Sequence, residues 1–382
     1  MLITAGVVTL LIWISLLFFR GQFWRMRAVH SGPAASAARI AAIIPARNEA
    51  DVVGQTVTSL LRQSGNHELQ IFLVDDGSTD GTAQAARDAA RAIGGPARLA
   101  VIEGQPLSAG WSGKLWAMQQ GIALARLSNP DFFLFTDADI VHAADSVSTL
   151  ISILQSENRD MASFMVKLHC QSFAEKMLIP AFVFFFFKLY PPDWIANPRR
   201  KTAGAAGGCI LLRPAVLERA GGIEAIRSEV IDDCALAARI KHVGGRLWLG
   251  ASSTTKSIRP YGGFSGIGGM ISRSAFNQLH HPALLLALSL AGMAMTYLLP
   301  PALALFSHRL APATLGATAW VLMTISFLPV LRLYRLNPLW ALALPGVAVF
   351  YLGATVHSAW KYWTGRGGQW KGRVQDPVRN LH

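Results

Sequence analysis

The stretch Phe132-Phe133-Leu134-Phe135-Thr136-Asp137-Ala138-Asp139 joins a short apolar run to two acidic residues. The apolar run is typical of a buried strand. Side chains at i and i+2 of an extended segment point to one face, so we expect Asp137 and Asp139 to lie together where the strand leaves the sheet. Two close carboxylates repel each other unless a cation separates them, and such oxygen ligands suit Mg²⁺ or Mn²⁺. Because a lone Asp-x-Asp is more often a solvated turn, its interpretation depends on the rest of the chain.

Strands and helices alternate along the chain up to this stretch. The apolar pattern predicts strands at 40–44, 71–74, 99–102 and 132–135, and helices at 51–62, 79–93 and 114–125. The alternation is typical of an α/β fold with a mostly parallel sheet covered by helices on both faces. Ligands of such sheets bind beyond the carboxyl ends of the strands, which is where the acidic residues lie.

Two further strand ends carry acidic residues. They read Ile44-Pro45-Ala46-Arg47-Asn48-Glu49 and Val74-Asp75-Asp76-Gly77-Ser78. Gly77 suits a sharp turn and Ser78 suits a helix cap, but neither role requires two acids before them. A carboxylate at a strand end can accept hydrogen bonds from a ribose hydroxyl or a base N–H. The sequence has no GxGxxG after the first strand and no Walker A loop, so the competing nucleotide-binding motifs fit badly.

Lys114 and the pair Asp232-Asp233 are further candidates for chemistry. Lys114 opens an expected helix, where a lysine suits a phosphate and is equally compatible with an ordinary surface position. Asp232 and Asp233 precede another helical pattern. They either complement the helix dipole, which is a common arrangement, or one of them is a general base that removes a proton from an acceptor hydroxyl.

The composition indicates a membrane protein. Of 382 residues, 52% are hydrophobic and only 15% are charged, with the apolar excess near the ends. The formal net charge is +13, and many Arg and Lys residues flank apolar runs, which fits membrane topology better than nucleic acid. Cys170, Cys209 and Cys234 show no paired spacing, so we expect neither a disulfide framework nor a zinc site.

The apolar segments predict how the chain is divided. Residues 1–20 are expected to form a retained transmembrane anchor, because the positive residues follow the apolar stretch instead of preceding it. The expected regions after it are a linker at 21–38, a catalytic domain at 39–281, a C-terminal membrane region of two or three helices at 282–360, and a basic tail at 361–382.

Two apolar segments leave alternatives open. Three C-terminal crossings would place the basic tail across the membrane from a cytoplasmic catalytic domain, against the positive-inside rule. We therefore expect the block 339–360, interrupted by Pro345-Gly346, to be re-entrant or buried. The segment 178–190 is too short to span a bilayer and is either a buried helix or an element in the membrane interface.

The acidic motifs together resemble those of family 2 glycosyltransferases. The motifs that carry the resemblance, in order, are Pro45-Ala46-Arg47-Asn48-Glu49, Asp75-Asp76-Gly77-Ser78, Asp137-x-Asp139 and Asp232-Asp233-x-x-Leu236. The resemblance covers about 39–281. It implies the nucleotide-sugar-binding GT-A fold, a nucleotide-sugar donor and a divalent metal, Mg²⁺ or Mn²⁺.

A narrower resemblance is to the bacterial hopanoid-associated (hopene-associated) membrane glycosyltransferases. The stretches that carry it are Gly113-Lys114-Leu115-Trp116-Ala117, Leu178–Phe185, Ala205-Ala206-Gly207-Gly208-Cys209 and Ile231–Leu236. This resemblance implies a lipid acceptor, a bacterial inner-membrane location as a multi-pass protein, and a cytoplasmic catalytic domain.

The family resemblance implies roles residue by residue. Asp233 would be the catalytic base beside Asp232, and Asp139, helped by Asp137, would bind the metal on the diphosphate. Ala46, Glu49 and Asp76 would hold the nucleoside. The full set expected to contact the nucleotide-sugar is Pro45, Ala46, Glu49, Asp75, Asp76, Lys114, Asp137 and Arg273.

The sequence departs from the family pattern at two places, and the second bears on how many sugars are transferred. Asp232 stands where the family usually has Glu. The Gln-x-x-Arg-Trp signature of processive synthases is absent, with Ser272-Arg273-Ser274 in its place, which favours transfer of one sugar and leaves Arg273 as a diphosphate contact. UDP is the usual nucleotide of the family. Alternatives are a carotenoid, ceramide, diacylglycerol or polyprenyl phosphate acceptor, or a catalytically silent membrane scaffold that binds nucleotide-sugar.

Overall fold

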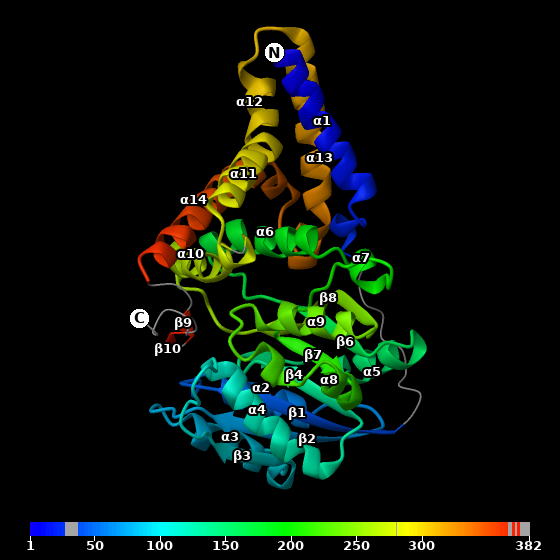
Figure 1. Ribbon diagram of the computed structural model, residues 1–382, viewed down its shortest axis with the longest axis vertical. Helices are drawn as coiled ribbons and strands as arrows, with labels where there is room; N and C mark the ends of the chain where they lie inside the picture. The colour runs from blue at the N-terminus through cyan, green and yellow to red at the C-terminus, as the bar shows by residue number, and fades with distance from the viewer. Residues whose placement is uncertain (27–36, 280, 366–368, 371–372, 375–382) are drawn as a thin grey trace. The chain divides into compact units, whose positions relative to one another are not determined.

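The computed structural model describes residues 1–26, 37–279, 281–365, 369–370 and 373–374 (Figure 1). The chain divides into two compact units. We call residues 27–169, 194–259 and 368–382 the sheet unit, and residues 1–26, 170–193 and 260–367 the helical unit. Parts of the predicted linker (27–36) and of the predicted basic tail (366–368, 371–372 and 375–382) lie outside the described residues.

The sheet unit is built on one eight-stranded sheet with the order β3-β2-β1-β4-β7-β6-β8-β5. Its strands are β1 (Ala38–Ala46), β2 (His67–Asp75), β3 (Leu99–Glu103), β4 (Phe132–Thr136), β5 (Ile140–Val141), β6 (Met161–Lys167), β7 (Cys209–Leu212) and β8 (Leu247–Ser257). A short antiparallel pair, β9 (Gln369–Trp370) and β10 (Arg373–Val374), is separate from it.

The first half of the sheet is parallel. β1 pairs in parallel with β2 and β4, and β2 pairs in parallel with β3. The helices that connect these strands are α2 (Val53–Leu61), α3 (Thr82–Ala92) and α4 (Gly113–Ala125). All four predicted strands and all three predicted helices of this half are confirmed, with end points that differ by a few residues.

The second half of the sheet contains both parallel and antiparallel strand pairs. β7 is antiparallel to β4 and to β6, whereas β8 is parallel to β6 and antiparallel to β5. The helices in this part of the unit are α5 (Ser146–Ser156), α8 (Pro214–Arg219) and α9 (Asp232–His242). β8 therefore runs in the same direction as β1, β2 and β4, and its carboxyl end lies at the same edge of the sheet. The expected α/β class with a mostly parallel sheet is confirmed.

The core of the sheet unit explains the uninterrupted apolar runs in its strands. Ile43, Ile44, Phe133 and Phe135 are almost completely buried. Strands covered on both faces need apolar side chains in both directions, so they read as continuous runs and do not alternate. Each such side chain stabilises the fold by about 1.5–3 kcal/mol relative to full exposure.

The helical unit contains four stretches that are long and apolar enough, by length and composition, to cross a membrane. They are α1 (Leu2–Phe19), Ala283–Phe306, Leu310–Tyr334 and Pro338–Trp363. The named helices within the last three are α11 (Ala283–Met293), α12 (Leu299–Phe306), α13 (Leu310–Tyr334) and α14 (Leu344–Trp363). Large apolar side chains on them, including Leu11, Leu288, Val321 and Val349, are exposed, as expected of helices that face lipid. These helices support a membrane protein.

α1 is a packed member of the helical unit (Figure 1). Nε1 of the fully buried Trp13 donates a hydrogen bond of 2.8 Å to the carbonyl oxygen of Thr296, and its ring meets Tyr297 edge-on at 5.6 Å. Gly6 allows close approach to α13, because a Cβ placed there would lie 2.9 Å from Cβ of Leu315. The N-terminal segment therefore packs against other helices of the helical unit.

The segment predicted at 178–190 belongs to helix α6 (Phe173–Leu189) of the helical unit. A capping box starts it, in which Ser172 and Glu175 each accept a hydrogen bond from the other's backbone N–H. Leu178, Ile179 and Phe184 are fully buried. This burial favours the first of the two alternatives, a buried helix.

The observed divisions differ in part from the expected bounds. Pro345 lies in the first turn of α14, where proline is tolerated, directly after a 3-10 segment at Pro338–Ala343. That the block 339–360 is re-entrant or buried stays a prediction. Within the range 39–281 expected for the catalytic domain, 170–193 and 260–281 cluster with the helical unit, together with α10 (Gly263–Ser274).

Candidate functional site

The carboxyl ends of β1, β2 and β4 lie next to one another. The register places Ala46 opposite Asp75, and the Asp76 N–H donates a hydrogen bond of 2.8 Å to the carbonyl oxygen of Ala46. Because β1 also pairs with β4, the Asp137 turn follows at the same edge. The sheet thus brings together the strand-end residues predicted for nucleoside binding, including Pro45.

Asp75 and Asp76 have different surroundings. Oδ1 of Asp75 accepts a hydrogen bond of 2.9 Å from the Ser78 N–H and so closes the turn in which Gly77 has φ +65°. Asp76 is only 2% exposed, and its Oδ2 lies 3.7 Å from Nη1 of Arg47. The arginine also donates to the carbonyl oxygen of Asp76. Asp75 therefore stabilises the turn after β2. Asp76 is the acid that is buried, and it lies beside the guanidinium of Arg47.

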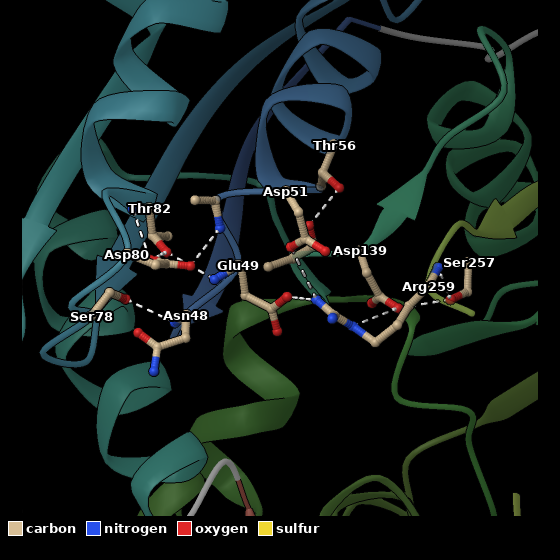
Figure 2. Close-up of polar contacts among 12 residues, drawn as sticks. Asn48, Glu49, Asp51, Thr56, Ser78, Asp80, Thr82, Asp139, Ser257 and Arg259 are labelled. Atoms are coloured by element: carbon tan, nitrogen blue, oxygen red, sulfur yellow. Dashed lines mark hydrogen bonds and ion pairs between the residues drawn. The ribbon is translucent and has the colours of Figure 1, made fainter. Parts of the chain in front are cut away.

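Backbone hydrogen bonds fix the loop that carries Glu49 (Figure 2). The Glu49 N–H donates to Oγ1 of Thr82 at 2.8 Å, and the Ala50 N–H donates to Oδ2 of Asp80 at 3.0 Å. Thr82 and Asp80 are themselves hydrogen-bonded. These contacts tie the loop after β1 to the turn after β2, so Glu49 is positioned by two strand ends.

Lys114 lies among carboxylates at the start of α4. Its Nζ is 3.0 Å from Oδ1 of Asp137 and 3.1 Å from Oδ2 of Asp232. We call Lys114, Asp137, Asp232 and Asp233 the lysine cluster. Burial alone would lower the pKa of Lys114, but the three carboxylates outweigh it and raise that pKa above its usual value. The ammonium is therefore a fixed positive charge at the edge of the sheet.

Asp233 accepts hydrogen bonds with both oxygens. Oδ2 accepts from the Gly207 N–H and Oδ1 from the Cys234 N–H, each at 2.7 Å. Loss of hydration raises the pKa of Asp233 to about 6, and the adjacent charge of Asp232 adds to this, against the opposing effects of Lys114 and the two N–H donors. A carboxyl group with a pKa of this size is a better proton acceptor than an ordinary aspartate.

A pocket opens onto the lysine cluster. Its polar lining comprises Lys114, Thr136, Asp137, Asp232 and Asp233, with Gly207 and Pro45 beside them. The apolar part of the lining is Leu115, Met118, Phe135, Ile210, Ile223, Ile226 and Leu236. Acidic residues from two distant segments of the chain therefore face one cavity at the carboxyl edge of the sheet.

A second cluster surrounds Arg259, which follows β8 (Figure 2). Nη2 of Arg259 forms an ion pair with Oε2 of Glu49 and lies 3.9 Å from Oδ1 of Asp51. Nε of Arg259 lies 3.9 Å from Oδ2 of Asp139, which also accepts a 2.7 Å hydrogen bond from Oγ of Ser257. We call these five residues the arginine cluster.

The structure divides Asp137 and Asp139 between the two clusters. The expectation of a shared face assumed an extended backbone, but residues 138 and 139 form a turn. Among the described residues, no group of three or more His, Cys, Asp or Glu side chains is placed to hold a metal. Mg²⁺ is commonly held by one or two carboxylates together with substrate phosphates. The described side chains therefore form no metal site by themselves, and a metal held by either carboxylate would need further ligands, such as the oxygens of a diphosphate.

Two arginines remain to be placed, of which the sequence predicted one. Arg273 lies in α10 of the helical unit, whereas the other predicted site residues lie in the sheet unit. Arg259 was not predicted at all. A signal for it exists in the sequence, because a strand recognised at 247–257 would place Arg259 at a carboxyl end, beside the acidic turns.

Comparisons with known proteins agree with this architecture. Residues 41–221 match the family model described as Glycosyl transferase family 2. The chain is similar to the solved structure of the mannosyltransferase PcManGT from Pyrobaculum calidifontis, in complex with GDP-Man and Mn²⁺, with 18% identity, a TM-score of 0.55, and coverage of 94% of this chain and 99% of that chain.

A second similar structure is the mannosyl-3-phosphoglycerate synthase from Rubrobacter xylanophilus, with 15% identity, a TM-score of 0.41, and coverage of 69% of this chain and 85% of that chain. The comparison with curated proteins gives no match. At these identities the structural likeness to the mannosyltransferase shows a GT-A-like fold. The family-model match and the fold together support a family 2 glycosyltransferase.

Proposed function

We propose that the protein is a membrane-bound inverting glycosyltransferase that moves one sugar from a nucleotide-sugar to a lipid acceptor. The observation that carries the proposal is the pocket in which Asp233 faces Lys114 and Asp137. This arrangement supplies a proton acceptor and a fixed cation within one cavity, at the sheet edge where α/β folds bind their ligands.

The donor would lie along the carboxyl ends of the strands. Ala46, Glu49 and Asp76 would hold the nucleoside, with Pro45 and Asp75 beside them. Asp139, with Asp137, would hold Mg²⁺ or Mn²⁺, which neutralises charge on the diphosphate. UDP is the nucleotide we propose, and GDP belongs in the test because the similar mannosyltransferase structure contains GDP-Man and Mn²⁺.

The residues of the lysine cluster would perform the transfer. Lys114 stabilises negative charge that develops on the leaving diphosphate. Asp233 takes the proton of an acceptor hydroxyl, whose oxygen then attacks the anomeric carbon opposite the leaving group. The bond to the diphosphate oxygen breaks as the new glycosidic bond forms, so one displacement inverts the anomeric centre.

A lipid acceptor is supported by the four apolar helices. From the resemblance to hopanoid-associated enzymes, we propose a hopanoid as the acceptor, a location in the bacterial inner membrane, and a cytoplasmic sheet unit. Carotenoid, ceramide, diacylglycerol and polyprenyl phosphate are the alternative acceptors, and the experiment below separates them.

The test is transfer of labelled sugar by the purified full-length protein in detergent. UDP- and GDP-sugars are supplied with Mg²⁺ or Mn²⁺ and with separate lipid classes, and products are identified by mass spectrometry. We expect one lipid class to gain one sugar, and Asp233→Asn to abolish transfer while nucleotide binding persists. Asp88→Asn, an exposed acid on α3, is the matched control and should transfer normally. Nucleotide-sugar binding with neither transfer nor donor hydrolysis would indicate the silent scaffold instead.

A further inference from the structure

Arg259 occupies the site that the proposed donor and metal need. Glu49 and Asp139 come from the ends of different strands, and the guanidinium of Arg259 lies between them. Glu49 is 8% exposed, so its charge is poorly compensated by water. Without a cation at this point, the two carboxylates would repel each other.

A guanidinium and a divalent metal cannot both neutralise Asp139 from the same side. Nε of Arg259 lies 3.9 Å from Oδ2 of Asp139, and a second cation bound to that carboxylate would meet a like charge at close range. Oδ2 of Asp139 is also engaged by Ser257, which fixes the orientation of the carboxylate toward Arg259. The charge of Arg259 therefore opposes metal binding at Oδ2 of Asp139 for as long as the guanidinium stays in this position.

We propose that Arg259 is an internal counter-ion that holds Glu49 and Asp139 before the donor arrives and is exchanged for the donor and its metal. The inference rests on the proposed function, because it takes Glu49 and Asp139 as nucleoside and metal contacts. The inference adds Arg259 to the proposed site. It also predicts that Arg259 suppresses metal binding until the nucleotide is bound.

The released guanidinium has a chemically suitable new partner. Arginine presents a planar set of N–H donors that matches a phosphate with two parallel hydrogen bonds, as it matches a carboxylate. The diphosphate of the donor supplies such oxygens. In the bound state Arg259 thus becomes a diphosphate contact, and its charge moves from the carboxylates to the leaving group.

The experiment measures Mn²⁺ binding to the full-length protein in detergent by electron paramagnetic resonance, without nucleotide and then with UDP or GDP. Arg259→Gln removes the competing charge, so we expect Mn²⁺ affinity without nucleotide to rise about tenfold or more. The same variant should bind UDP or GDP more weakly than wild type, whereas uridine or guanosine, which lack the diphosphate, should bind at least as well as to wild type because Glu49 is no longer occupied by Arg259.

Arg259→Lys keeps the charge and loses the paired donors. We expect its Mn²⁺ affinity without nucleotide to stay near that of wild type, while its KM for the donor rises. This variant also serves if Arg259→Gln fails to fold. Arg246→Gln is the matched control, because Arg246 pairs with Asp160 at 3.7 Å in the same unit, away from the site. It should change neither measurement.

The outcomes separate the two proposals. If Mn²⁺ binds wild type with nucleotide and sugar is transferred, but Arg259→Gln has the wild-type Mn²⁺ affinity without nucleotide, the counter-ion role is wrong and the proposed function stands. Weaker Mn²⁺ affinity in Arg259→Lys than in wild type would also contradict the role. If wild type neither binds Mn²⁺ with nucleotide nor transfers sugar, the proposed function fails and the inference fails with it.

Discussion

The backbone N–H of Gly207 donates a 2.7 Å hydrogen bond to Oδ2 of Asp233. The space beside this glycine is also limited. A Cβ at position 207 would lie 3.3 Å from that oxygen and 3.5 Å from Nζ of Lys114. The proposed base and the proposed diphosphate cation are therefore both positioned against one residue without a side chain.

Gly207→Ala should lower transfer without unfolding the protein. The added methyl group crowds Oδ2 of Asp233, so we expect kcat to fall about tenfold or more while Tm changes little, because small misplacements at reacting groups are costly. Gly54→Ala on α2 is the control, since its Cβ would meet Ala89 at 3.5 Å and the carbonyl oxygen of Ala85 at 3.8 Å, both ordinary contacts. Wild-type kcat in Gly207→Ala would contradict the packing described for Asp233.

The pH dependence of kcat/KM should reveal the raised pKa of Asp233. The base must be ionised, and its pKa is raised to about 6, so activity should rise with pH through about 6. An ordinary aspartate would titrate near 3.9 and give no loss of activity at pH 5 to 6. Asp232→Asn removes a charge that raises this pKa, so its midpoint should move to lower pH. A midpoint unchanged by Asp232→Asn would show that another group titrates.

Lys114→Gln should cost about a hundredfold or more in kcat/KM, the loss typical of removing a group that stabilises developing charge. Because Lys114 lowers the pKa of Asp233, the activity midpoint of the variant should also move to higher pH, opposite to Asp232→Asn. Opposite shifts in two neighbouring variants would identify Asp233 as the titrating group. A hundredfold loss with an unmoved midpoint would restrict Lys114 to the leaving group.

Gly6→Val should destabilise the helical unit. Its Cβ would lie 2.9 Å from Cβ of Leu315, and overpacking of this kind costs roughly 1–3 kcal/mol. The measurement is the Tm of the full-length protein in detergent. Gly292→Ala on α11 is the control, since nothing lies within 4 Å of its Cβ. A Gly6→Val protein with the Tm of the control would mean that α1 does not pack on α13.

The sequence predicts the parts of the fold and site that depend on local pattern. β4 and its acidic turn were recognisable because a buried strand is an apolar run and two acids after it are unusual. Asp232 and Asp233 were recognisable because they are adjacent and open a helix. In each case the informative residues lie within one short segment.

The parts that the sequence did not predict depend on long-range contacts. Arg259 has no local motif, and its partners Glu49 and Asp139 follow other strands. The division of Asp137 from Asp139 depends on a turn, which the strand pattern before it does not specify. The start of α14 at Leu344, beside Pro345, is another example, because the apolar pattern of 339–360 alone does not show where the helix begins.

The two units are interleaved along the chain, and this limits how the protein can be dissected. The chain changes unit at 26–27, 169–170, 193–194, 259–260 and 367–368. Truncation at both ends would still leave α6, whose apolar residues normally pack within the helical unit, exposed on the fragment. A water-soluble version needs an internal deletion: a short polar linker in place of 170–193, with the chain ending at 259.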